Sequence, residues 1–187
     1  NSIADGLSLD VTERRHLHYL AKIAGGDCAG QRHHAPVPMR REARPAARET
    51  LRLLEPHGVA MVTNKLGDVL ATTSAFDRLM EPTGLLDADQ PNLVRYIFTD
   101  ARSHDALINW DQIADQQSFD LWHAPTITAT EWLTADIASQ AGPAFTARVN
   151  QKLPPTPHPW EIRLTDGGTT RWQREVLDIP ADPSNKS

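Results

Sequence analysis

The sequence predicts an α+β domain in which a small antiparallel sheet packs against helices. Two β-hairpin patterns carry this prediction, one in residues 58–73 and one in residues 160–179, because each is a pair of short runs joined by a tight turn. Between the hairpins, residues 90–151 show mostly helical spacing of apolar side chains. Strands near both ends with helices between them are the pattern of an α+β fold.

The composition indicates one globular domain with a short appendage. The 187 residues are 40% hydrophobic and 23% charged, and the net charge of −5 comes without a long basic run, so the chain lacks an electrostatic footprint for nucleic acid. No apolar run approaches the length of a membrane span, and the first residues lack a signal-peptide pattern. The single Cys28 cannot form an internal disulfide, which fits a reducing cytoplasm. We therefore expect a cytoplasmic protein without a membrane partner.

Residues 7–26 are predicted to form a helix that precedes the main domain. Asp10 and Glu13 stand at capping-box spacing, apolar residues recur at helical spacing after them, and Gly25-Gly26 supplies a stop. Residues 27–43 hold prolines and histidines without a sustained period, which indicates a linker.

A second helix is predicted from Pro45 to Leu54. Proline is favoured in the first turn, Leu51 and Leu54 are expected to face inward, and Pro56 ends the segment. Its basic residues recur at i,i+4 and are interpreted as a solvated outer face: Arg44, Arg48 and Arg52.

The clearest strand pattern follows. Residues 58–64 are a short apolar, β-branched run, residues 64–67 read as a turn, and residues 68–73 form a second short strand. Ser74 is expected to cap the next helix, in which Phe76, Leu79 and Met80 share one face.

Four helices are predicted after this first hairpin unit. The last two are separated by Gly142-Pro143, and four prolines in residues 153–159 indicate an exposed, semi-rigid connection back to the strands. The predicted helices are Pro91–Phe98, about Ser103–Trp122, Thr128–Gln140 and Pro143 to about Asn150.

The second hairpin is predicted from the runs Trp160–Leu164 and Thr169–Ile179. Asp166-Gly167-Gly168 between them is a strong hairpin-turn sequence. Apolar and charged residues alternate along both runs, which is typical of a half-buried antiparallel pair.

One cation interrupts the most apolar stretch of the chain. In the predicted helix after Pro91, apolar residues at i,i+4 spacing form a wide stripe, and Arg95 lies near its border. A guanidinium there can run its methylenes along apolar neighbours and present its donors to a carboxylate, either the protein's own or a ligand's.

The same stretch carries a family resemblance. NLVRYIFTDAR at residues 92–102, with Trp110 and Ile113-Ala114, resembles the core signature of the MmyB-like regulators of actinobacteria. The resemblance covers about residues 44–180. It implies a PAS-like ligand-binding domain, with the strand–turn–strand–helix order of residues 58–82 as its opening. It also implies a small hydrophobic ligand, with a fatty acid as the ligand the family suggests.

The first residues add a second resemblance. LSLDVTERRHLHYLAKIAG at residues 7–25 is similar to the last helix of a xenobiotic-response helix-turn-helix domain. We therefore expect residues 1–26 to be the end of a truncated DNA-binding domain, residues 27–43 to be a linker, and residues 44–187 to be the PAS-like domain. DNA would be bound only through the missing N-terminal part. A regulator of this kind is expected to be a homodimer.

An enzyme function has no support in the sequence. The chain holds no nucleophile elbow, phosphate-binding glycine loop, dinucleotide fingerprint or zinc-helix motif. Cys28 has no neighbour that would lower its pKa, and His16 and His18 point in different directions on a helix. No catalytic residue, metal site or cofactor is therefore predicted.

The ligand site is predicted between the sheet and the helices, where PAS-like domains hold small molecules in an apolar pocket with a few polar groups. The alternative for each apolar residue is an ordinary core position. The predicted lining residues are Val62, Leu70, Phe76, Leu79, Val94, Ile97, Phe98, Trp110, Phe119, Trp160 and Trp172.

Three polar residues are candidates for holding a ligand's anionic group. Arg95 and Arg102 supply the cations and Asn92 a further donor, and the alternative for the arginines is an internal ion pair, for instance with Asp100 or Asp105. If the core is filled instead, the domain is a ligand-free dimerisation or protein-interaction module of the same regulator.

Overall fold

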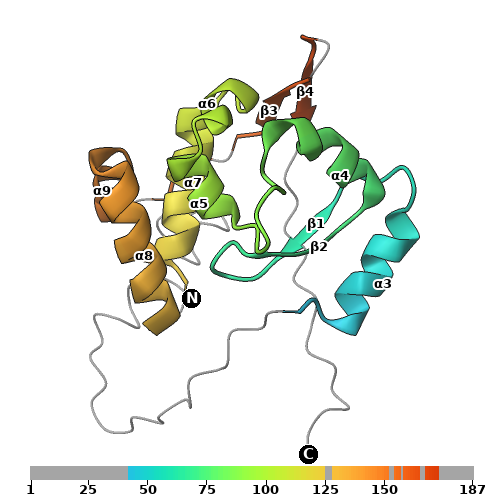
Figure 1. Ribbon diagram of the computed structural model, residues 1–187, viewed down its shortest axis with the longest axis horizontal. Helices are drawn as coiled ribbons and strands as arrows, with labels where there is room; N and C mark the ends of the chain where they lie inside the picture. The colour runs from blue at the N-terminus through green and yellow to red at the C-terminus, as the bar shows by residue number, and fades with distance from the viewer. Residues whose placement is uncertain (1–41, 125–127, 152–153, 157, 165–166, 173–187) are drawn as a thin grey trace, which may run out of the picture.

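Seven α-helices and two antiparallel hairpins make up the part of the chain that the computed structural model describes, which is residues 42–124, 128–151, 154–156, 158–164 and 167–172. This arrangement confirms the predicted α+β class. Helix α3 lies at one end of the molecule and helices α8 and α9 at the other, with the first hairpin between them (Figure 1). The predicted helix in residues 7–26 and most of the predicted linker lie outside the described residues.

Helix α3 spans Pro45–Leu54, as the proline at its first position predicts. Ala47 and Leu51 are buried, whereas Leu54 is 42% exposed, so its predicted inward orientation is wrong. The reason is that the helix ends at Leu54 and the backbone becomes extended at Glu55. Leu54, as the last residue of the helix, therefore lacks the cover that buries Leu51.

Strands β1 (Met61–Thr63) and β2 (Val69–Thr72) form the first predicted hairpin. The turn begins at Asn64, whose Oδ1 accepts hydrogen bonds from the backbone N–H groups of Leu66 and Asp68 at 2.9 and 3.0 Å. Gly67 has φ +85°, and a Cβ there would lie 2.8 Å from Val94 Cγ2. Glycine therefore permits both the turn and the close approach of the helix that carries Val94.

Helix α4 spans Ser74–Met80 and continues into the short 3₁₀-helix η1 (Glu81–Thr83). The N-cap is Thr73, whose Oγ1 accepts from Phe76 N–H, so the predicted cap at Ser74 is wrong by one residue. Thr73 is favoured because its hydroxyl also donates to Gly58 O at 2.7 Å, which ties the helix start to the hairpin. Ser74 instead bonds to the Glu55 carboxylate.

Helix α5 spans Leu93–Thr99 and begins where the chain passes the first hairpin. Val69 N–H donates to Pro91 O at 2.9 Å, and Leu93 N–H donates to Gly67 O at 2.8 Å. These two bonds fix the apolar stripe of α5 against β2 and its turn.

The helix predicted over Ser103–Trp122 is two helices, α6 (Arg102–Ala106) and α7 (Trp110–Trp122). The interruption comes from a contact distant in sequence, because Leu107 pairs with Ile162 and Ile108 N–H donates to Glu161 O at 2.8 Å. Asn109 reinforces it by accepting from Glu161 N–H at 2.9 Å. Backbone groups that would have continued the helix are thus used by the second hairpin.

Helices α8 (Thr128–Ala141) and α9 (Pro143–Gln151) are separated at Gly142, as predicted. They pack against each other, α8 against α5 and α9 against α7. Gly142 has φ +56°, the left-handed conformation in which a helix commonly ends.

Strands β3 (Trp160–Arg163) and β4 (Thr169–Trp172) form the second hairpin. Trp160 pairs with Trp172 and Glu161 with Arg171, whose guanidinium lies 2.6 Å from the Glu161 carboxylate. Buried Trp160 and Ile162 alternate with more exposed charged residues, as predicted. The described strands form two separate two-stranded sheets. Residues 173–179 of the predicted last strand lie outside the described part.

The buried apolar residues form two clusters. The first lies between α4, α5, α7 and the second hairpin, and the second joins Leu66 and Val94 to α7, α8 and α9. Phe98 packs against both, with its ring 5.7 Å from Trp110 and 4.9 Å from Phe145.

Candidate ligand-binding site

Aromatic side chains from distant segments meet in the first cluster. The Phe76 and Trp172 rings lie 6.2 Å apart, and Trp160 and Trp110 are buried in the same cluster. The predicted lining residues that belong to this cluster or pack against it are Phe76, Leu79, Ile97, Phe98, Trp110, Trp160 and Trp172.

The other predicted lining residues are dispersed. Val94 is buried in the second cluster, Phe119 on α7 belongs to neither cluster, and Val62 and Leu70 are half-buried in β1 and β2. Within the first cluster the side chains are packed against one another, so a ligand among them would have to displace core contacts.

Trp110 is held on several sides. Its indole Nε1–H donates to Ile97 O at 3.0 Å and approaches Ser103 Oγ at 3.2 Å. The His104 ring stacks on it with centroids 4.1 Å apart, and the Arg148 guanidinium lies 5.0 Å from its ring centroid. An indole with its N–H bonded and two neighbours on its ring is a rigid support for a charged group.

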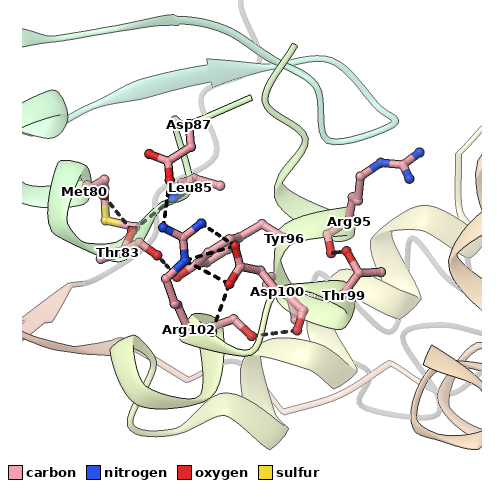
Figure 2. A network of polar contacts seen from close by, with 11 residues as sticks. Met80, Thr83, Leu85, Asp87, Arg95, Tyr96, Thr99, Asp100 and Arg102 are labelled. Carbon is pink, nitrogen blue, oxygen red and sulfur yellow. Dashed lines mark hydrogen bonds and ion pairs between the residues drawn. The ribbon is translucent and has the colours of Figure 1, made fainter. Parts of the chain in front are cut away.

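Arg95 points away from the core. Figure 2 shows its side chain leaving α5 on the side opposite to the Arg102 network. Its Nη1 forms an ion pair with Asp136 on α8, and its guanidinium lies 5.6 Å from the ring centroid of Trp132. The internal partner is thus a residue 41 positions away, and the pair is shared by α5 and α8.

Arg102 is the centre of a polar corner between η1 and α6. Its guanidinium lies between the carboxylates of Asp87 and Asp100, each 2.7 Å away (Figure 2). The hydrogen bond from Arg102 lowers the pKa of Asp100 below its usual value, and the two carboxylates raise the pKa of Arg102. The internal pair with Asp100 is the alternative expected from the sequence.

Gly84 makes this corner possible. A Cβ at Gly84 would lie 2.0 Å from Cζ of Arg102, and its φ of +81° is a conformation that side chains disfavour. Beside it, Tyr96 Oη donates to Thr83 O at 2.9 Å, and burial raises the pKa of the Tyr96 phenol. The corner thereby holds η1 against α5.

Asn92 is the N-cap of α5. Its Oδ1 accepts from Arg95 N–H at 2.9 Å, while its Nδ2 donates to Leu66 O and to Asp68 Oδ1 at 3.0 and 2.7 Å. These bonds join the turn of the first hairpin to α5, so the amide of Asn92 is fully engaged.

A cleft of about 350 Å³ opens between α7, α9 and the described residues 154–156 and 158. Its described walls are more polar than apolar, because aromatic and proline side chains share the lining with polar and charged ones, and its volume falls in the range of small-molecule sites. The lining residues are Gln112, Asp115, Phe119, Trp122, Arg148, Val149, Gln151, Pro154, Pro155, Thr156 and His158.

Of the residues predicted from the sequence, Phe119 lines this cleft, and Trp110 supports it through Arg148. Arg148 itself was not predicted. One signal was present in the sequence: Gln112, Asp115, Phe119 and Trp122 recur at spacings of three, four and three, which places polar and aromatic side chains on one face of a helix.

Within the described residues, no group of three or more histidine, cysteine or acidic side chains is placed to bind a metal ion. The helices of this part of the chain are also all too short or too polar to cross a membrane.

Comparison with known families gives the context of the cleft. A model of the MmyB-like transcription regulator ligand binding domain matches residues 43–186, which is more than half of the chain. The chain belongs to this family. The resemblance seen in the signature at residues 92–102 is thereby confirmed. This MmyB-like domain is the ligand-binding part of a transcription regulator, and its family is a family of regulators rather than of enzymes. Searches of curated proteins and of solved structures gave no match.

Proposed function

We propose that this MmyB-like domain binds a small hydrophobic carboxylate, such as a fatty acid, in the cleft beside α7. The observation that carries the proposal is the composition of that cleft: aromatic and proline walls adjoin the half-buried cation Arg148. Ligand sites of this size are mostly apolar and contain a few polar groups that orient the molecule. This cleft is more polar than that, so its apolar part would be the surface of Phe119, Trp122 and the two prolines.

The tail would supply most of the affinity. Burying a chain of about 14 carbons at about 0.8 kcal/mol per methylene gives on the order of 10 kcal/mol before ordering costs. The cation would then fix the orientation of the ligand. Roles for Arg95, Arg102 and Asn92 in holding the carboxylate, and for the packed aromatic cluster in holding the tail, stay predictions.

The proposed regulator is a cytoplasmic homodimer that binds DNA through a domain N-terminal to this one. In this proposal residues 1–26 close the DNA-binding domain and residues 27–43 link it to the ligand-binding domain. Apolar side chains at the end of α3 support a contact with a second copy, since Leu53 is 71% exposed and Leu54 42% exposed. A ligand would act by binding better to one arrangement of the two copies.

Native mass spectrometry of the purified chain, followed by denaturing extraction, tests both parts of the proposal. We expect a dimer that carries, or takes up on addition, a long-chain carboxylic acid. A Leu53→Asp variant should shift the species towards the monomer. A chain that stays without ligand when hydrophobic carboxylates are added would contradict the sensor function.

A second candidate is a ligand-free dimerisation or interaction module. The tight packing of the first cluster favours it, because Ile97, Leu107 and Ile162 are at most 1% exposed. In that case the same measurement gives a dimer that rejects every added acid.

A further inference from the structure

Arg148 and its partner Asp111 differ sharply in exposure. The Arg148 side chain is only 19% exposed, whereas the Asp111 side chain that pairs with its Nη2 is 81% exposed. Nη1 donates to Ala144 O at 2.7 Å, and the guanidinium lies on the Trp110 ring. The Arg148 cation is therefore fixed by the protein, while the Asp111 carboxylate that pairs with it is mostly surrounded by solvent.

The remaining edge of the guanidinium is incompletely used. Arg148 Nε lies 2.9 Å from Asp115 Oδ1, but its N–H does not align with that oxygen. This buried N–H has no hydrogen-bond acceptor among the described residues. An unsatisfied buried donor of a cation is unfavourable and is relieved by a better-placed acceptor.

We propose that Asp111, which lies just outside the lining of the cleft, holds Nη2 of Arg148 in the unliganded domain and that a hydrophobic carboxylate entering the cleft takes over this nitrogen. This inference rests on the proposed function and adds the group that anchors the ligand and the residue that competes with it. Phe119, Trp122 and Val149 would then contact the tail.

The exchange costs little on the Asp111 side. Its side chain already lies mostly in water, and exposed ion pairs contribute little stability. Asp111 also lies in the first turn of α7, where the helix dipole favours a negative charge even without Arg148.

One guanidinium can hold two carboxylates, so Asp115 need not leave. The same molecule contains an example, because Arg102 contacts Asp87 and Asp100 at once. After the exchange, Arg148 would hold Asp115 and the ligand in the same way.

The test uses isothermal titration calorimetry on the full chain after removal of co-purified lipid. The probes are tetradecanoate and, as an uncharged match, 1-tetradecanol. Arg148→Met keeps the apolar stem and removes the charge, and Asp111→Asn removes the competitor from an exposed position. Arg95→Met tests the rival anchor, and Arg52→Met, at an exposed ion pair of α3, is the matched arginine control. Circular dichroism establishes that each variant is folded.

We expect Arg148→Met to weaken tetradecanoate binding by about tenfold or more with little change for the alcohol. Asp111→Asn should strengthen binding of the acid by a few-fold and leave the alcohol unchanged. Arg52→Met should change neither.

Three outcomes would overturn the inference. If Arg95→Met weakens acid binding and Arg148→Met does not, the anchor is Arg95. If Asp111→Asn leaves the acid affinity unchanged or reduces it, the exchange is wrong even where Arg148 matters. If the unaltered chain binds neither probe, the proposed function fails, and the inference fails with it.

Discussion

The Arg102 corner and the Arg148 cleft use the same side-chain chemistry for different ends. Arg102 is 52% exposed and lies between two carboxylates on its own side of the molecule, one of them only two residues away. Arg148 is 19% exposed, lies on an indole, and meets one of its two carboxylate partners, Asp111, at an exposed position on another helix. The Arg102 ion pairs join two neighbouring segments of the chain, whereas Arg148 is a cation that lines an open cleft.

This difference indicates where a ligand's carboxylate would bind. Displacing Asp100 from Arg102 would also break the contact of η1 with α6, because Gly84 is packed directly on the guanidinium. Displacing Asp111 from Arg148 disturbs one side chain at the surface. Arg102 also has an exposed partner, because the Asp87 side chain is 59% exposed. What separates the two arginines is therefore the packing of η1 on the Arg102 guanidinium, which the Arg148 guanidinium does not share.

The largest expected loss of stability comes from Trp110, which lies beneath Arg148 at the cleft. Trp110→Ala should lower the free energy of unfolding by about 3–5 kcal/mol, because it removes a buried ring that supports Arg148 and contacts Phe98. Urea denaturation measures the loss. Phe119→Ala, at a half-buried wall position, is the control and should cost clearly less. Equal losses of unfolding free energy would mean that Phe119 in the wall contributes as much to the core as Trp110 beneath it.

Gly84→Ala tests the Arg102 corner. We expect a loss of about 1 kcal/mol from the positive φ alone, with a further loss because the new Cβ pushes the guanidinium from its carboxylates. In an Arg102→Ala background only the backbone part should remain. Thermal unfolding of the four proteins measures this coupling, and fully additive losses would contradict the close contact.

Tyr96→Phe should cost about 1 kcal/mol through loss of the hydrogen bond to Thr83 O. Burial raises the pKa of Tyr96 in the folded state, so its contribution is complete below the unfolded value of about 10 and is lost as pH rises through the folded pKa. Stability measured from pH 8 to 11 should therefore fall more steeply for the unaltered chain than for the variant. Parallel curves would contradict this assignment.

The smallest expected effect is on stability at acidic pH, through the Asp100 carboxylate. Arg102 lowers the pKa of Asp100, so the contribution of this carboxylate is present above its unfolded pKa of about 3.9 and is lost as pH falls through the lower folded pKa. Asp100→Asn should accordingly weaken the dependence of the melting temperature on pH below about 4. An unchanged acid profile would show that the corner depends on packing alone.

Much of the fold was predictable because proline and glycine residues mark where its helices and turns begin or end. Pro45 begins α3, Gly67 forms the first turn, and Gly142 separates α8 from α9. The break between α6 and α7 was not predictable, since it depends on backbone bonds from Leu107 and Ile108 to a strand more than fifty residues away.

The candidate site was predictable only in part. The apolar stripe of α5 and the alternation in β3 identified core-facing side chains, and Phe119 was predicted to contact a ligand. The partner of Arg95 and the support of Arg148 both come from contacts between helices distant in sequence. Sequence spacing identifies the cations but not their surroundings.

The most direct test of the central claim is a side-chain NMR titration that follows the Nε–Hε signals of arginine as tetradecanoate is added. We predict that the Arg148 signal shifts with ligand concentration, because the carboxylate on the same guanidinium is exchanged, while the signals of Arg95 and Arg102 stay in place. A saturable shift of Arg95 or Arg102 with Arg148 unchanged would contradict the assignment of Arg148 as the anchor.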